Sequence, residues 1–177
     1  LTASQGGAFI LCASYEDMTA FQERLAGMAE GLYEVRAQNG GLDSLITWFK
    51  TAPNGVLLGV KSLWEGVDIP GLKLRLVIIP RLPFPNPDDP VFTARKGKYA
   101  QMQVKQGTDA KAADIQAWQH YDLQEVIMDF KQGGGRLMRR ETDMGVVAVL
   151  DKRAHSNTKR YSATIRGALP HKLTYDL

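Results

Sequence analysis

The chain has little cysteine and no long apolar run. Cys12 is the single cysteine among 177 residues, so the chain cannot form an intrachain disulfide, a four-cysteine zinc site or an iron–sulfur cluster of its own. No apolar segment approaches the roughly 20 residues that span a bilayer, and none is led by Lys or Arg in the manner of a signal peptide. We therefore expect a cytoplasmic protein with no membrane partner.

The composition is that of a globular chain, with 44% hydrophobic and 23% charged residues. These fractions argue against disorder, a collagen-like repeat and a coiled coil. The length suits one ordinary domain with a sizeable core, and we predict a single domain over residues 1–177.

Positive charge is concentrated in the last third of the chain. The whole sequence has 22 Lys and Arg against 19 Asp and Glu, a net charge of +3. Residues 131–166 hold nine Lys or Arg and three Asp or Glu, a balance of +6, which leaves −3 for the rest. This region is either a solvated basic face or an anion-binding face.

Short apolar runs alternate with helical patterns along the chain. The run at 8–14 predicts a strand buried on both faces, and two further apolar runs at 55–60 and 74–80 predict strands as well. Residues 32–37 could form another strand, and 145–150 predicts one last buried strand. Helical spacing follows the first run, and it recurs from Asp43 to before Pro53 and over 91–106 and 111–131. The glycines at 133–135 predict an interruption before a helix-like segment over 136–141. The pattern indicates an α/β fold with a mostly parallel sheet flanked by helices.

A phosphate-binding P-loop is missing from this pattern. The motif needs GxxxxGK[ST], and the nearest match, residues 59–62, has Val60 in place of the glycine before the lysine. No Asp-Glu pair follows an apolar strand either. We expect that the chain does not hydrolyse ATP by itself.

Residues 62–71, SLWEGVDIPG, directly follow a predicted strand, where loops of parallel sheets meet ligands. The carboxylates of Glu65 and Asp68, with Gly66 and Gly71 allowing close backbone approach, suit a switch loop that contacts ribose, a metal-bound water or a partner domain. The alternative is a capped turn in which both carboxylates satisfy exposed amides.

Residues 132–140, QGGGRLMRR, place Arg136, Arg139 and Arg140 at helical spacing after a glycine run. Guanidinium groups held in this way stabilise the charge that develops on a transferring phosphoryl group. The alternative is a basic helix end on a solvated face.

Taken in order, these segments resemble the second motor domain of DinG-type, XPD-like superfamily 2 DNA helicases. Residues 11–15 resemble motif IV of that family, 62–71 resemble motif V, and 132–139 match the QxxGRxxR of motif VI. The loop 81–90, with four prolines, resembles the proline-rich segment between motifs V and VI. Residues 143–153 resemble the strand after motif VI, which ends in Asp-x-Arg.

The resemblance implies a RecA-like domain that closes over ATP and Mg²⁺ bound mainly by a first motor domain of the same polypeptide. Arg136 and Arg139 would be arginine fingers that Gln132 orients. The coupling of nucleotide state to DNA grip would fall to Glu65, Gly66 and Asp68, and the residues near the single-stranded DNA path would be Ser14, Tyr15 and Arg81.

For the whole protein the resemblance implies a monomer that moves 5′ to 3′ on single-stranded DNA and unwinds forked or structured DNA. Any iron–sulfur cluster would belong to the first motor domain. Two other hypotheses stay open. One is a stand-alone nucleic-acid-binding module that grips phosphates with residues 131–166, and the other is an inactive interaction fold descended from a motor.

Overall fold

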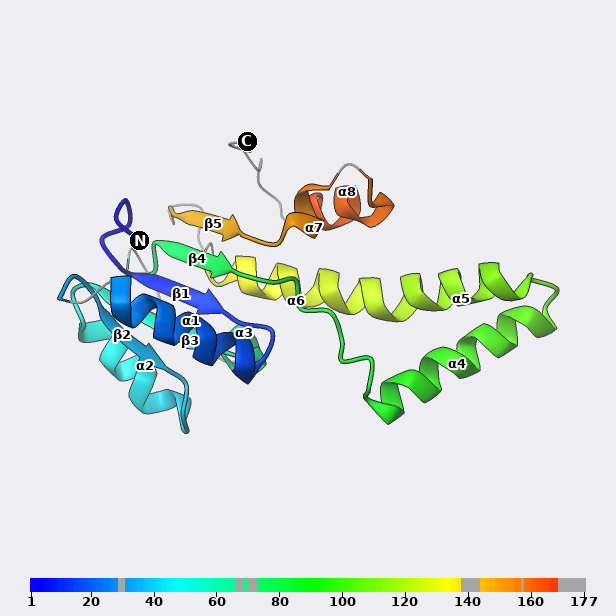
Figure 1. Ribbon diagram of the computed structural model, residues 1–177, viewed down its shortest axis with the longest axis horizontal. Coiled ribbons are helices and arrows are strands. Elements are labelled where there is room, and N and C mark those ends of the chain that lie inside the picture. Colours follow the sequence, from blue (N-terminus) through cyan, green and yellow to red (C-terminus); the bar gives the residue numbers. More distant parts are fainter. Residues whose placement is uncertain (29–30, 66–68, 70–72, 138–143, 157, 169–177) are drawn as a thin grey trace.

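A five-stranded sheet, in which every pairing is parallel, forms the centre of the protein (Figure 1). This computed structural model describes residues 1–28, 31–65, 69, 73–137, 144–156 and 158–168. The strands are β1 (Ala8–Leu11), β2 (Glu34–Ala37), β3 (Gly55–Gly59), β4 (Leu76–Ile79) and β5 (Val146–Val149), in the spatial order β2-β3-β1-β4-β5. The predicted α/β class with a mostly parallel sheet is confirmed.

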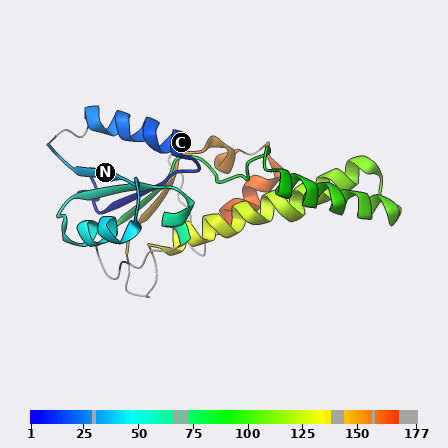
Figure 2. The same cartoon turned by 90° about the horizontal axis from the view of Figure 1, so that it is seen from below.

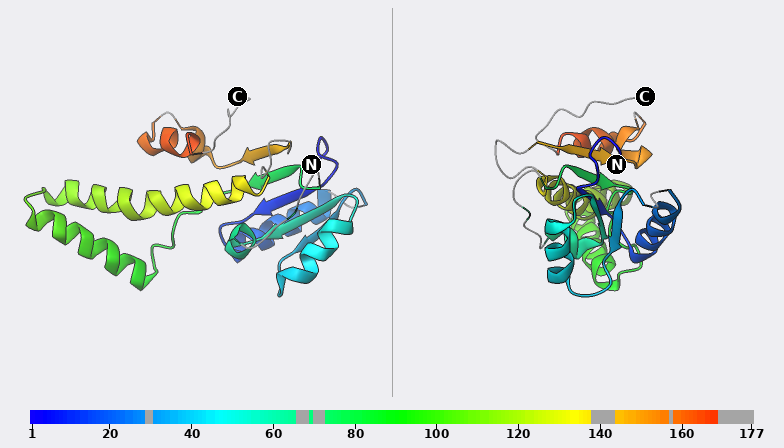
Figure 3. Two further views of the ribbon diagram at one scale, coloured as in Figure 1. Left: turned by 180° about the vertical axis from the view of Figure 1, so that it is seen from behind. Right: turned by 90° about the vertical axis from the view of Figure 1, so that its left-hand side faces the viewer.

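Helices cover both faces of the sheet. They are α1 (Tyr15–Met28), α2 (Leu42–Thr51), α3 (Lys61–Glu65), α4 (Pro90–Lys105), α5 (Ala110–Trp118), α6 (Gln124–Gly135), α7 (Lys152–His155) and α8 (Arg160–Arg166), with a π-helical segment η1 (Gln119–Leu123) between α5 and α6. Helix α1 lies on one side of the sheet, and α2 and α6 lie on the other (Figure 3).

Alternating side chains along the strands build a core on each face. Phe9 and Leu11 of β1 pack with α2, α3 and α6, whereas Ala8 and Ile10 pack with α1. Both sets are buried, which explains why the central strands appear in the sequence as continuous apolar runs.

The last strand differs from its prediction. The run at 145–150 predicts a buried strand, yet β5 is an edge strand and Val146 is 61% exposed. A strand at the edge of the sheet has a neighbour on one side only, here β4. The prediction of a strand is correct, and the prediction of full burial is wrong.

Helices α4 and α5 form a hairpin that extends away from the sheet (Figures 1 and 2). The proline-rich segment before it forms no helix or strand, as predicted, up to Asp89. The carboxylate of Asp89 accepts the amides of Val91 and Phe92, and Pro90 occupies the first helical position, so α4 begins sharply there. At the tip, Gly107 has a φ of +94° and Asp109 caps α5.

The helical segment on the return side of the hairpin runs further than predicted. Through η1, α5 continues into α6, and α6 continues to Gly135. The predicted interruption at 133–135 is wrong, because Gly133 and Gly134 are buried and their packing outweighs their low helix propensity. Arg136 is the C-cap residue and Leu137 lies in the following turn, so the helix predicted from residue 136 does not begin there; its residues 138–141 lie outside the described part. Among the described residues, no helix has both the length and the apolar character needed to cross a membrane.

Candidate functional site

Three of the predicted site residues lie where β1 and β4 end. The Ser14 hydroxyl accepts the Asp17 amide at 3.1 Å, in the first turn of α1. Tyr15 is the first residue of α1 and is 61% exposed. Arg81, two residues after β4, places its Nη1 atom 3.5 Å from Oδ1 of Asp17. The structure therefore brings Ser14, Tyr15 and Arg81 together at the carboxyl edge of the sheet.

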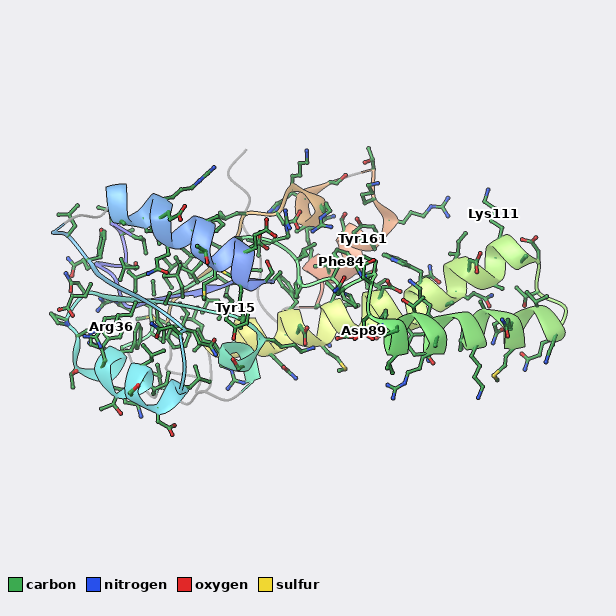
Figure 4. The ribbon with its side chains drawn as sticks, turned by 60° about the horizontal axis from the view of Figure 1, so that its bottom comes forward. Tyr15, Arg36, Phe84, Asp89, Lys111 and Tyr161 are labelled. Carbon is green, nitrogen blue, oxygen red and sulfur yellow. The ribbon has the colours of Figure 1, made fainter. Side chains whose placement is uncertain are left out.

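An open hollow of about 720 Å³ lies next to this group, between α1 and α2. Tyr15 and Thr19 line it from α1, and Arg36 of β2 and Asn39 just after that strand also line it. Figure 4 labels Tyr15 and Arg36. The Arg36 guanidinium lies 4.5 Å from the ring centroid of Trp48. Aromatic, cationic and amide side chains thus surround one hollow. A surface with these groups can bind a flexible, negatively charged chain and stack on the rings that the chain exposes.

Gln38 holds the start of the 62–71 segment, and no motif in the sequence predicted this role. It directly follows β2 and is only 6% exposed. Its Oε1 accepts the Val60 amide at 3.2 Å and its Nε2 donates to the Ser62 hydroxyl at 2.6 Å. A polar residue directly after a predicted strand was the available signal.

Gly59 makes this close arrangement possible. A Cβ at this position would lie 2.7 Å from Cδ2 of Leu63 and 3.0 Å from Oε1 of Gln38. The last residue of β3 must therefore be glycine if α3 is to pack directly against the strand end.

Lys61, the first residue of α3, connects this segment to α6. Its Nζ lies 3.1 Å from Oε1 of Glu125 and 3.3 Å from Oδ2 of Asp129, whose side chain is 7% exposed. Burial lowers the pKa of Lys61, but the hydrogen bonds and charges of the two carboxylates outweigh it and hold the pKa above its ordinary value. The Lys61 ammonium is thus a stable charged bridge between α3 and α6.

The remaining predicted residues divide between described and undescribed parts. Glu65 ends α3, whereas Gly66, Asp68 and Arg139 lie outside the described residues. Gln132 is exposed in the last turn of α6, and Arg136 is partly exposed at its C-cap.

The C-terminal end of α6 lies near the opposite edge of the sheet from Ser14, Tyr15 and Arg81. Gly145, directly before β5, packs so closely on this end that a Cβ there would lie 2.5 Å from Cδ1 of Leu137. Gln132 and Arg136 therefore do not join the group at the carboxyl edge. They share with α3 the face of the sheet that α6 covers.

Asp151 fixes the proline-rich loop to the end of β5. Its carboxylate accepts the Leu82 amide at 2.9 Å and the Nη2 group of Arg153 at 2.6 Å. The Arg153 guanidinium in turn lies 4.8 Å from the ring centroid of Phe84. The Asp-x-Arg pair noted in the sequence thus holds the loop that carries Arg81.

Comparison with known proteins gives a match over nearly the whole chain. A family model described as "Helicase C-terminal domain" matches residues 1–172. The ATP-dependent DNA helicase YoaA of Escherichia coli is 33% identical over 172 residues, 96% of this chain and 24% of that protein. The ATP-dependent helicase DinG of Mycobacterium tuberculosis is 43% identical over 114 residues, 64% of this chain and 15% of that protein.

The fold also has a counterpart among solved structures. An apo structure of XPD matches with a TM-score of 0.64 and 21% identity, over 96% of this chain and 32% of that one. The chain therefore spans about a quarter or less of the length of these two curated relatives, and about a third of the solved chain.

Proposed function

The chain belongs to the helicase C-terminal domain family, and on that premise we propose that it is the second motor domain of a DinG-type, XPD-like ATP-dependent DNA helicase. In this proposal the domain supplies part of a shared ATP site and part of the track for single-stranded DNA. A first motor domain of the same polypeptide supplies the rest.

The observation that carries this proposal is the direct connection between α3 and α6. Helix α3 begins the 62–71 segment, and α6 ends in the QGGGR segment. Lys61 joins the two helices through Glu125 and Asp129 on one face of the sheet. A motor needs the segment that couples nucleotide state to DNA and the segment that contacts ATP to move together, and this ion-paired contact joins the two.

Arg136 and Arg139 act as arginine fingers in this account, with Gln132 orienting them. Hydrolysis develops negative charge on the transferring γ-phosphoryl group, and guanidinium groups aimed at it stabilise the transition state. This part of the proposal is supported by the place of Arg136 at the end of a helix whose last turn packs Gly133 and Gly134 into the fold. Glu65, Gly66 and Asp68 would transmit the nucleotide state to the DNA.

The single-stranded DNA path is proposed to run past Ser14, Tyr15 and Arg81. Tyr15 offers an exposed ring on which a base can stack, and Arg81, which pairs with Asp17 but keeps 63% of its side chain exposed, offers a guanidinium that a phosphate can also reach. The hollow between α1 and α2 extends this surface. Movement from 5′ to 3′, action on forked or structured DNA and a monomeric state belong to the same proposal.

ATP and Mg²⁺ would be held mainly by the first motor domain. The loop after β3 has Val60 where a P-loop needs glycine, and Gln38 occupies its backbone amide. The chain's own part is to present arginines to a phosphate that is bound elsewhere. An iron–sulfur cluster, if the protein has one, would be bound outside this chain, which has one cysteine.

A stand-alone nucleic-acid-binding module is the second candidate. This module would bind phosphates with the basic region 131–166, but some cations of that region already interact with other groups of the fold. Arg153 pairs with Asp151, and Nη1 of Arg166 donates to the Ala154 carbonyl at 3.0 Å. The region therefore offers fewer cations to a partner than its composition indicates.

ATP turnover tests the division of labour. The complete two-motor polypeptide is expected to hydrolyse ATP faster when single-stranded DNA is added, and the purified 177-residue chain is expected to give no turnover above background. Turnover by the chain alone at the rate of the complete protein would overturn the shared site. A complete polypeptide whose rate of ATP turnover is the same with and without single-stranded DNA would overturn the motor function.

A further inference from the structure

One face of α4 carries exposed side chains that the fold does not use. Val91, Arg95, Lys98, Met102 and Lys105 follow one another at spacings of four, three, four and three residues, and all five are exposed. At 3.6 residues per turn they fall within about 80° of each other around the helix. We call these five residues the α4 stripe.

The opposite face of α4 makes the contacts that hold the hairpin together. Ala100 is buried there, Tyr99 stacks on His120 with 4.6 Å between ring centroids, and Phe92 lies 6.0 Å from Tyr121. The aromatic side chains of α4 are therefore turned toward η1. The five stripe side chains are exposed and make none of these ring contacts; at the end of the stripe, Lys105 borders an open hollow with Ala110 and Asp114 of α5.

Charge is segregated between the two sides of the hairpin. Helix α4 contains four cations and no acidic residue. Lys96 pairs with Asp122 at 3.1 Å, whereas the three stripe cations form no ion pair with any described residue. The acidic side chains of the neighbouring segment 110–135 are Asp114, Asp122, Glu125 and Asp129. A face that only needs hydration usually mixes both signs, and this one does not.

The dimensions and chemistry of the stripe favour a duplex over a single strand. Arg95 and Lys105 are ten residues apart, or about 15 Å along a straight helix, and duplex DNA carries one phosphate charge per about 1.7 Å. Proteins that hold single strands add aromatic platforms for the bases, and the stripe has none. The stripe cations lie on a helix that extends from the sheet (Figure 2), so their spacing is fixed. A fixed row of cations suits the phosphate backbone of a duplex, which is itself stiff.

We propose that the α4 stripe binds the phosphate backbone of duplex DNA, next to the single strand held at the carboxyl edge of the sheet. This inference rests on the proposed function, because it assumes that the protein acts on DNA. It adds a second DNA surface, on a different element and for a different form of the nucleic acid.

The test compares two triple variants in the complete two-motor polypeptide and in the 177-residue chain. One removes the stripe cations, as Arg95→Ala, Lys98→Ala and Lys105→Ala. The control removes three exposed cations elsewhere, as Arg24→Ala, Lys50→Ala and Lys111→Ala; Lys111 lies on α5 and points away from α4 (Figure 4). Circular dichroism melts confirm that both variants fold, and fluorescence anisotropy measures binding of a blunt duplex and of an oligothymidine strand at several salt concentrations.

The stripe variant is expected to bind the duplex at least about tenfold more weakly. Its slope of log affinity against log salt should flatten by about 3, since each phosphate that a stripe cation no longer neutralises lowers the slope by about one unit. Single-strand binding and the control should change less than about twofold.

Four results would overturn the inference. The first is an equal loss of duplex affinity in the stripe variant and the control variant, and the second is a stripe variant that binds the duplex as tightly as wild type. The third is a loss of duplex affinity in the 177-residue chain that is absent from the complete protein. The fourth is wild-type protein that binds polyglutamate as tightly as it binds the duplex. The third would mean that another part of the polypeptide covers the stripe, and the fourth that it suits acidic proteins. In each case, single-strand-stimulated ATP turnover would still support the proposed function, so the two failures are distinguishable.

Discussion

At the scale of single residues, the site depends on two residues that carry no reactive group. Gln38 satisfies the Val60 amide and the Ser62 hydroxyl, and Gly59 leaves room for Gln38 and Leu63. Both act by fixing where the chain turns after β3. Motif matching finds the residues with reactive groups, whereas the contacts of Gln38 and Gly59 form only once β2 and β3 are paired.

Gly59→Ala tests that packing. Its Cβ would lie 2.7 Å from Leu63 and 3.0 Å from Gln38, so we expect the free energy of unfolding to fall by about 1–3 kcal/mol. Gly27→Ala is the matched control, because nothing lies within 4 Å of a Cβ at Gly27 in α1, and it should stabilise the helix by up to about 1 kcal/mol. Urea unfolding of the two variants measures both effects. A Gly59→Ala protein as stable as wild type would show that α3 does not pack as described.

Asp151→Asn tests the anchor of the proline-rich loop through its pH dependence. Burial raises the pKa of Asp151, but hydrogen bonds from Arg153 and from the Leu82 amide outweigh it and hold the pKa below its ordinary value. A carboxyl group whose pKa is lower in the folded than in the unfolded state stabilises the fold at pH values above its unfolded-state pKa. That contribution is lost as the pH falls through the folded-state pKa.

Asp151→Asn should therefore lower the free energy of unfolding by about 1–3 kcal/mol at pH 7, and the difference from wild type should shrink below about pH 4. Urea unfolding at a series of pH values measures it. Asp114→Asn, on the exposed side of α5, is the control and should differ little from wild type throughout. A pH-independent difference for Asp151→Asn would contradict the anchoring role of its charge.

At the scale of elements, the sequence predicted what burial dictates and missed what tertiary contacts decide. The central strands were predicted because both their faces are buried, which leaves a continuous apolar run. Helix α3 was missed because five residues are too few to show a helical period. The predicted interruption at residues 133–135 was wrong because Gly133 and Gly134 are buried residues of α6. Local helix propensity carries no information about that burial.

Lys61→Met tests whether the contact between α3 and α6 couples the two motif-bearing segments. In the complete polypeptide, we expect the factor by which single-stranded DNA stimulates ATP turnover to fall at least about fivefold, the size of a typical coupling between sites. Lys50→Met, at an exposed position of α2, should leave that factor unchanged. Steady-state ATP hydrolysis with and without DNA measures it. An undiminished factor in Lys61→Met would remove the lysine bridge from the coupling path.

At the scale of the whole molecule, the structure places the two predicted groups of site residues at different ends of the sheet. The group of Ser14, Tyr15 and Arg81 lies at the carboxyl edge of the sheet, and the end of α6 with Arg136 lies near the other edge. The sequence predicted the residues of both groups, and a linear motif order could not show this separation. Nor could it show that α4 and α5 leave the sheet as an arm, since their apolar spacing predicts helices but not their direction.

The separation fits a domain with two surfaces, one proposed for DNA and one for a phosphate bound by another domain. The arm adds a third surface, outside the sheet. Each surface is built on a different element, so variants in one should leave the others intact.

The central claim is that this chain contributes arginines to an ATP site that it does not itself complete. The most direct measurement is ATP turnover by the complete polypeptide with saturating single-stranded DNA, for Arg136→Ala and for the control Arg160→Ala, an exposed arginine of α8. The account predicts that kcat falls about 10³-fold or more in Arg136→Ala, with single-strand affinity unchanged, and that it stays at the wild-type value in Arg160→Ala. A wild-type kcat in Arg136→Ala would contradict it.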